Sequence, residues 1–291
     1  MAERRYEYAP AGTLPGLLQR GRGLGALMAA EDPGAAAELV YGCVRWEWRW
    51  DPRVDERGRY LARLIRDLEL PLGPVVEVLS GAEEARARAV RVLELLALGG
   101  SAEAREALGA RGALGALGAS ASSWRERAGA GAGSAVGHGE ERDVPALVAE
   151  LEQAWVDRAW CGPMHLARGL AGFGPEAADA VSLLRRFWLQ TPHSSERAAY
   201  LEALAALGSA GMAEAYTESL WDCEADARLL GAEHAPDTPQ VRARLASLRD
   251  DPVEEPEVRN TAGARLAGLA PGTPEGCGGA SPREGRARVD A

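Results

Sequence analysis

Lysine is absent from this sequence, and all 33 basic residues are arginine. We attribute this bias to a GC-rich coding sequence rather than to a mechanism. Against 43 acidic residues, the arginines leave a net charge of −10 and an isoelectric point near 5.1. A nucleic-acid backbone needs a cationic surface on its partner, so this balance argues against nucleic acid as the principal partner.

Other scarcities narrow the class of protein. Aromatic residues make up 5% of the chain, so the 46% of hydrophobic residues are mostly Ala, Leu and Val, which favour helices over sheets. No stretch approaches the about 18 apolar residues of a membrane span, and no apolar signal-peptide core follows the N-terminus. The four cysteines are scattered without CxxC spacing, which is typical of reduced thiols. We therefore expect a cytoplasmic protein.

The segment VRWEWRW decides how the first part of the chain is interpreted. As a strand, it would place Trp46, Trp48 and Trp50 on one face. However, Asp32 followed by proline is a typical helix start. Apolar residues then repeat at the spacing of one helix face, at Leu39, Cys43, Trp46 and Trp50. We therefore predict a helix that continues through Trp50, with Trp46 and Trp50 in the core and Trp48 at its rim.

More short helices are predicted downstream. One apolar stripe comprises Val54, Leu61, Leu64, Ile65 and Leu68. Four arginines between these positions are expected to face outward, namely Arg57, Arg59, Arg63 and Arg66. Residues 82–98 form a further predicted helix, which ends at Gly99, and Ser101 is expected to cap the next one.

An internal repeat supports a stack of helical hairpins. Residues 88–99 align without a gap with residues 197–208, sharing an arginine, several small or leucine positions and a closing glycine. A weaker copy ends at Gly174, which lies 34 residues before Gly208. A period in this range is typical of helical solenoids.

Residues 248–262, LRDDPVEEPEVRNTA, resemble a HEAT repeat, in which an aspartate in the inter-helix turn precedes Val-Arg and a small residue. The whole chain is similar to an uncharacterised actinobacterial group of HEAT-repeat proteins, which brings no assigned activity. The resemblance implies an all-α, armadillo-type solenoid of roughly six to eight antiparallel helix pairs. A tetratricopeptide array remains the alternative, although its Trp, Gly and Tyr positions are not matched in register.

The composition along the chain suggests four parts. We expect N-terminal helical repeats at 1–108, a Gly/Ala-rich degenerate repeat and linker at 109–143, HEAT-like repeats at 144–270 and a disordered tail at 271–291. Whether the Gly/Ala-rich part is a folded unit or a flexible linker is left open, because each glycine costs about 1 kcal/mol inside a helix.

No catalytic, cofactor or metal site is predicted. The glycines from Gly21 to Gly25 lack the preceding strand of a dinucleotide loop. Four possible zinc ligands are too scattered to be expected to converge, namely Cys161, His165, Cys223 and His234. The sequence around His193 is interpreted as a helix entry whose hydroxyls cap a helix, not as a nucleophile with its base.

The strongest candidate for binding is acidic. On one continuous helix, Glu218, Asp222 and Asp226 would form a ridge at i, i+4 and i+8, suited to a basic partner or, less well, a divalent cation. A solvated outer face is the simpler interpretation. With Trp48, these residues are our candidates for partner binding. We hypothesise a non-catalytic scaffold or adaptor that holds a protein segment on a concave face, and the acidic balance suggests a partner with a basic segment.

Two enzymatic alternatives come from resemblance. HEAT-like DNA glycosylases use Trp, Asp and Arg on a concave face, and residue types of that kind occur here at Trp155, Asp157, Arg158, Trp160 and Trp188. This hypothesis requires arginines clustered around the three tryptophans. A HEAT-like lyase that attaches a bilin is a weaker possibility.

Overall fold

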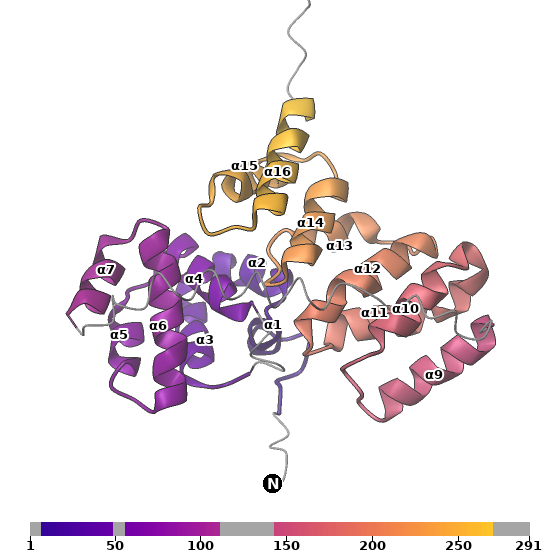
Figure 1. The fold of residues 1–291 in the computed structure, drawn as a ribbon, viewed down its shortest axis with the longest axis horizontal. Helices are drawn as coiled ribbons and strands as arrows, with labels where there is room; N and C mark the ends of the chain where they lie inside the picture. Colours follow the sequence, from indigo (N-terminus) through magenta and orange to yellow (C-terminus); the bar gives the residue numbers. More distant parts are fainter. Residues whose placement is uncertain (1–6, 49–55, 111–142, 270–291) are drawn as a thin grey trace, which may run out of the picture.

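The computed structural model describes residues 7–48, 56–110 and 143–269, and within these ranges it contains helices and turns but no strand (Figure 1). The all-α prediction is confirmed for this part of the chain. The first half contains α1 (Leu14–Arg20), α2 (Gly23–Glu31), α3 (Pro33–Arg45), α4 (Arg57–Asp67), α5 (Gly73–Val78), α6 (Glu83–Leu98) and α7 (Ala102–Gly109). The second contains α9 (Val144–Val156), α10 (Met164–Ala171), α11 (Val181–Gln190), α12 (Arg197–Ala206), α13 (Met212–Ser219), α14 (Ala225–His234), α15 (Pro239–Asp250) and α16 (Pro256–Leu269), with short 3₁₀ helices η2 (Gly174–Ala180) and η3 (Ser194–Glu196).

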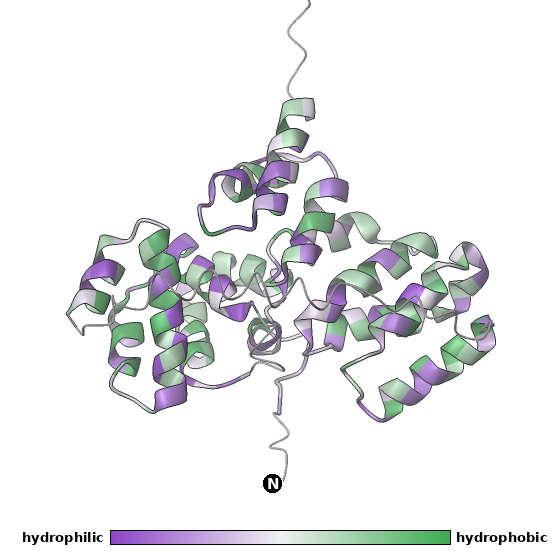
Figure 2. Cartoon of the chain, in the orientation of Figure 1, coloured by the Kyte–Doolittle hydropathy of each residue, from purple (hydrophilic) through white to green (hydrophobic). Residues whose placement is uncertain are grey.

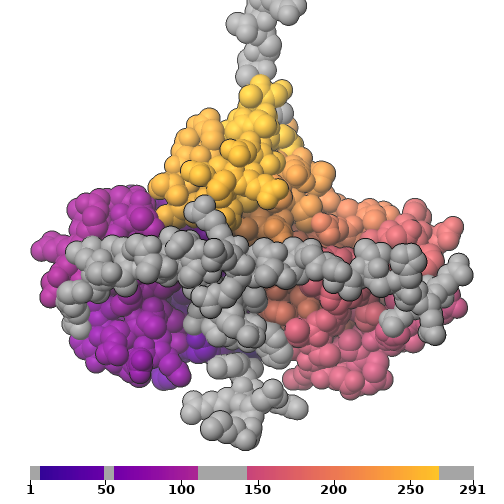
Figure 3. Space-filling view, viewed as in Figure 1, coloured from indigo at the N-terminus to yellow at the C-terminus, as the bar shows by residue number. Residues whose placement is uncertain are grey.

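The helices form two lobes with a third group between them (Figure 1). Helices α3 to α7 make one lobe and α9 to α12 the other. Helices α1 and α2 lie at the junction between the lobes, and α13 to α16 lie above this junction. Helices close in sequence pack together, as α4 with α6, α10 with α12 and α15 with α16. Each lobe has its own buried apolar cluster, and a third lies under α14 to α16. In the space-filling view the C-terminal helices rise above the two lobes (Figure 3).

Local chemistry explains many helix boundaries. The side chains of Asp32 and Ser101 accept hydrogen bonds from the backbone N–H groups of Ala35 and Ala104, so both predicted caps are confirmed. Residues 83–98 form α6, as predicted. Most helices carry both hydrophilic and hydrophobic residues (Figure 2).

The internal repeat is offset by one residue in the structure. After α12, Gly208 donates to the carbonyl of Ala205 and has a positive φ of 72°. After α6, the residue with the matching bond and a positive φ, 103°, is Gly100 and not Gly99. Both glycines adopt the left-handed backbone that ends many helices.

The two halves of the chain also meet directly. Arg22 at the start of α2 bonds to Glu218 at the end of α13, 196 residues away. Gly21 accepts a backbone hydrogen bond from Cys223. In a one-dimensional repeat array, each unit contacts its neighbours only. The solenoid therefore stays a prediction, with a long-range junction added to the helix pairs.

The prediction that the arginines of α4 face outward is wrong for three of the four. Arg57, Arg59 and Arg63 are buried, and only Arg66 is half-exposed. Arg63 binds Asp251 and Glu254, which lie in the turn before α16. The C-terminal helices therefore cover the α4 face that local periodicity assigns to solvent.

The prediction for the tryptophan segment is also wrong in part. Helix α3 ends at Arg45, where Trp46 leaves the helical conformation with φ −111° and ψ 147°. The Trp46 side chain is 67% exposed, not buried. Trp50 lies outside the described residues, as do most of the 109–143 segment and the whole of 271–291.

Candidate functional site

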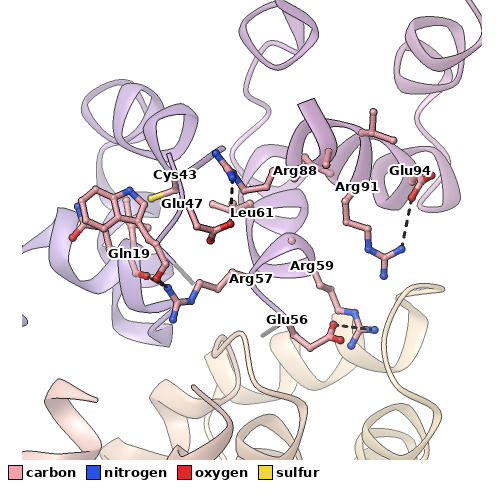
Figure 4. A pocket seen from close by; sticks show the side chains of 16 residues that line it. Gln19, Cys43, Glu47, Glu56, Arg57, Arg59, Leu61, Arg88, Arg91 and Glu94 are labelled. Atoms are coloured by element: carbon pink, nitrogen blue, oxygen red, sulfur yellow. Dashed lines mark hydrogen bonds and ion pairs between the residues drawn. The ribbon is translucent and has the colours of Figure 1, made fainter. Parts of the chain in front are cut away.

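A pocket with a volume of about 290 Å³ lies between α3, α4 and α6, and more of its lining surface is apolar than polar (Figure 4). Its apolar wall includes Leu18, Leu61, Val90 and Val92, and Trp48 closes one side. Its charged wall comprises Arg57, Arg59, Arg88, Arg91, Glu47, Glu56 and Glu94. Four guanidinium groups face three carboxylates, so the lining carries one net positive charge inside a protein of net charge −10.

Two of these arginines hold the walls in place. Arg88 of α6 donates to the carbonyls of Val44 and Arg45 and lies 3.2 Å from a Glu47 oxygen. Arg57 of α4 donates to the carbonyls of Gln19, Trp48 and Pro192. Because Arg57 and Arg88 donate hydrogen bonds to backbone carbonyls, their main role is to hold the surrounding segments in place.

Arg59 differs from its neighbours. Its Nη2 atom lies 2.8 Å from Glu255 Oε1 and 3.4 Å from Glu56 Oε2. Its Nε and Nη1 atoms are buried and have no hydrogen-bond partner among the described residues. A buried donor without a partner costs about 1–3 kcal/mol. An acceptor that reached the Arg59 donors would therefore stabilise the protein.

The rim of the pocket is less constrained. Arg91 is 36% exposed and lies 3.8 Å from Glu94, a weak contact from which it can turn (Figure 4). Cys43 lines the floor, and burial raises the pKa of its thiol to about 12, so the thiol stays protonated at neutral pH. Trp48 is half-buried, with its ring centroid 5.7 Å from that of Tyr8. Its predicted role in binding stays a prediction.

The three acidic candidates do not form a ridge on one helix. Glu218 is the penultimate residue of α13, Asp222 lies in the following turn, and Asp226 is in the first turn of α14. Only Asp226 is exposed. Glu218 bonds to Arg22 at 2.5 Å, and the buried Asp222 binds Arg197 through both carboxylate oxygens. The expected acidic face is therefore largely part of the junction between the halves.

The junction is a buried ion-pair network. Arg228 binds both oxygens of Glu254, which also accepts from Arg63. Burial opposes ionisation of Glu254, but Arg228 and Arg63 outweigh burial and lower its pKa to about 2. Glu224 has the opposite environment, since burial and the charge of Asp226 raise its pKa to about 8. Its Oε2 atom has no partner among the described residues.

The three tryptophans of the glycosylase hypothesis lie in two different places in the fold. Trp155 and Trp160 pack edge-on against Phe187, with centroid distances of 5.2 and 5.9 Å, in the core of their lobe. Trp188 instead lies under the guanidinium of Arg22, 4.4 Å from its ring centroid, at the junction. The guanidinium of Arg186 lies over Trp155, 4.3 Å from its ring centroid. The required cluster of arginines around all three rings is not observed among the described residues.

The residues considered for cofactors and zinc are not brought together as those hypotheses require. Helix α1, not a strand, precedes Gly21. Cys223 is buried 3.1 Å from an Arg197 nitrogen, whereas His234 is exposed on α14 beside the ring of Tyr216. Cys161 is exposed before α10, and its neighbours are His193 and Glu196.

Sequence reasoning missed the arginines of the pocket. The apolar stripe of α4 made its polar positions look solvated, and no local pattern marks Arg59 as buried. The partners of Arg59 and Arg63 lie almost 200 residues away, at Glu255 and Asp251. Only the tertiary structure brings these charges together.

Among the helices of the described residues, none has the length and apolar character needed to cross a membrane. No protein-family model, curated protein or solved structure matches the chain.

Proposed function

We propose that the protein is a non-catalytic binding protein, and that the pocket between α3, α4 and α6 takes an acidic group from a partner's peptide segment. The observation that carries this proposal is the buried Arg59 guanidinium with two donors unused. A carboxylate accepts hydrogen bonds from an arginine in parallel pairs, and such charge-assisted bonds are about twice as strong as neutral ones.

The size and walls of the pocket favour a peptide side chain over a larger ligand. Its volume of about 290 Å³ is at the low end for small-molecule sites. Apolar side chains line it beside the guanidinium groups, so an acidic residue with an apolar neighbour matches both surfaces. Trp48 at the side of the pocket supplies the kind of aromatic surface that is enriched in protein interfaces.

The sequence suggests a basic partner, whereas the pocket supports an acidic one. A basic partner follows from the net charge of −10 and from the acidic candidates. Glu218 and Asp222 are engaged by Arg22 and Arg197, so they do not offer a free acidic surface. The pocket that remains has a net positive lining, which supports an acidic partner segment.

We also propose that the helix pairs are arranged as divergent HEAT-like repeats. The pair α15 and α16 supports this proposal, since its two helices pack together and Asp251 lies in the turn between them, as in the HEAT pattern. In this chain that turn also contacts the first half, because Asp251 accepts a hydrogen bond from Arg63 of α4.

Selection from a library of random peptides tests the binding proposal. The library is selected on the wild-type protein and counter-selected on the Arg59→Ala variant. We expect enriched peptides to share an Asp or Glu beside an apolar residue. Arg59→Ala should weaken their binding at least about 10-fold, because a hydrogen bond to a charged group contributes about 1.5–3 kcal/mol.

Two further variants control this experiment. Arg91→Ala removes the rim guanidinium, whose ion-pair contact with Glu94 is at 3.8 Å, and it should weaken binding a few-fold. Arg168→Ala removes an exposed arginine of α10, in the other lobe, and should leave binding unchanged. Enrichment of basic peptides, or equal binding by wild type and Arg59→Ala, would overturn the proposal.

A further inference from the structure

Three side chains with metal-binding chemistry meet outside the pocket, where the turn before α10 contacts η3. The ligand atoms of Cys161, His193 and Glu196 all lie within 4.8 Å of one another. The thiol is on the exposed side, and Glu196 is buried. Packing of α10 against α12, which follows η3 directly, brings these sequence-distant residues together.

Glu196 is oriented by its neighbours. Its Oε1 atom accepts from the backbone N–H of Gly162, and Oε2 accepts from that of Met164 and from the hydroxyl of Tyr200. Burial and the adjacent Glu196 charge raise the pKa of Tyr200, so the phenol keeps the proton it donates. Oε1 also lies 3.3 Å from His193 Nδ1.

The imidazole is held from its other side. Ser195 Oγ lies 3.2 Å from His193 Nε2, so the hydroxyl is used here and not as the predicted helix cap. When Nε2–H donates to this hydroxyl, Nδ1 is unprotonated and carries the lone pair that a metal ion would need. Nδ1 also lies 3.2 Å from the carbonyl of Trp160, which accepts from the alternative Nδ1–H form. Second-side hydrogen bonds of this kind orient metal-binding histidines in proteins.

We propose that Cys161 Sγ, His193 Nδ1 and Glu196 Oε1 bind a divalent transition-metal ion of the zinc type. Zinc–nitrogen and zinc–oxygen bonds of about 2.0–2.2 Å at a tetrahedral angle separate the two ligand atoms by about 3.3–3.5 Å. The observed distance between Nδ1 and Oε1 is 3.3 Å. The ion takes the place of the proton between these atoms, and the thiol releases its proton on binding.

The ligand set also fits the charge of the ion. One thiolate and one carboxylate neutralise a dication, and a thiolate with an imidazole selects zinc-like metals over magnesium or calcium. Three protein ligands leave the fourth position of the tetrahedron to water, on the side where Cys161 is exposed. The sequence pairs Cys161 with His165, four residues on, but the folded chain supplies His193 instead.

Titration of the full-length protein with Co²⁺ tests this site, because a cobalt–thiolate bond gives a charge-transfer band in the near ultraviolet. We expect the band to saturate at one ion per chain. Cys161→Ser, a change at an exposed position, should abolish the band and weaken Co²⁺ and Zn²⁺ binding at least about 100-fold. Ser195→Ala, which removes the support of His193, should weaken binding about 10-fold.

Matched cysteine variants identify the thiol. Cys43→Ala and Cys277→Ser should both keep the band, because Cys43 lines the pocket between α3, α4 and α6 and neither cysteine is one of the three proposed ligands. Absence of the band in the wild-type protein, or its survival in Cys161→Ser, would overturn the proposal.

Discussion

Asp222 illustrates how a single buried charge connects the two halves of the chain. Its carboxylate receives Nε and Nη2 of Arg197 at 3.0 and 2.7 Å and caps the backbone N–H of Glu224. Arg197 in turn points at the carbonyl of Gly21 in the first half. Removing one partner of such a pair leaves the other charge buried without compensation.

Asp222→Ala should therefore lower the free energy of unfolding by about 3–5 kcal/mol. Asp226→Ala is the matched control, since Asp226 is exposed four residues later and should change stability by less than about 1 kcal/mol. Urea unfolding of both variants measures the difference. Equal effects would contradict the assignment of Asp222 to the buried network.

Glu224 should give the protein a distinctive pH dependence. Its folded pKa of about 8 lies above its ordinary value of 4.5, so the folded state binds more protons than the unfolded state between these values. Its contribution to stability is therefore lost as the pH rises from about 4.5 to about 8. Glu224→Gln removes this loss.

We expect the stability of Glu224→Gln relative to wild type to increase between pH 5 and pH 8, by at most about 1.4 kcal/mol per pH unit. Glu254 has the opposite sign, because its pKa of about 2 is below its ordinary value and its contribution is lost as the pH falls toward 2. Urea unfolding between pH 5 and pH 8 measures the effect of Glu224, and urea unfolding between pH 5 and pH 2 measures that of Glu254. A pH-independent difference between Glu224→Gln and wild type would show that Glu224 is ionised in the folded state.

At the scale of elements, the end of α3 shows where local pattern reading stops. The apolar spacing that starts at Asp32 predicts a helix through Trp50, and the start is correct. The C-terminal end of α3 is set by Arg88 of α6, which donates hydrogen bonds to the carbonyls of Val44 and Arg45. Because the last carbonyls of a helix need partners, a distant side chain can decide where it stops.

Helix α4 shows the same limit for a whole face. Its apolar stripe is real, since Leu61, Leu64 and Ile65 are buried. Its arginine face is buried too, because Asp251 and Glu254 lie against it. Periodicity separates the two faces correctly but does not reveal that a third group of helices covers the polar one.

The contact between α2 and α13 depends on a glycine. A Cβ atom at Gly23 would lie 1.9 Å from the carbonyl oxygen of Glu218, a backbone atom that cannot move freely. Gly42 in α3 has open space around its position. Both residues are helical, so alanine should be favoured locally at each.

We predict opposite effects for the two substitutions. Gly23→Ala should destabilise the protein by at least about 2 kcal/mol through overpacking, whereas Gly42→Ala should stabilise it by about 0.5–1 kcal/mol. Thermal unfolding of both variants provides the measurement. A neutral Gly23→Ala would show that α2 and α13 do not approach as closely as the structure indicates.

At the scale of the whole molecule, the sequence predicted the all-α fold class but not the contacts between the two halves of the chain. Alanine and leucine content, caps and short turns were sufficient for an all-α fold of paired helices. The Arg22 contact with Glu218 and the Arg63 contacts with Asp251 and Glu254 join residues that lie 188 to 196 positions apart in the chain. Such pairings leave no periodic trace, and the binding pocket depends on them.

The junction predicts that the halves associate without a covalent link. Co-expressed fragments 1–110 and 143–291 should purify together. Arg63→Ala should weaken their association at least about 100-fold, because Asp251 and Glu254 each lose their ion pair with Arg63. Arg86→Ala, at an exposed position of α6, is the control. Association that survives Arg63→Ala unchanged would contradict this role of the network.

The central claim is that Arg59 of the pocket binds an acidic group of a partner. Nuclear magnetic resonance of arginine side chains tests it most directly, because each Nε–H group gives its own signal. On titration with a selected acidic peptide, we predict that the Arg59 Nε–H signal moves downfield as its unused donor gains an acceptor, while the Arg168 signal stays in place. A peptide that binds without moving the Arg59 signal would contradict the account.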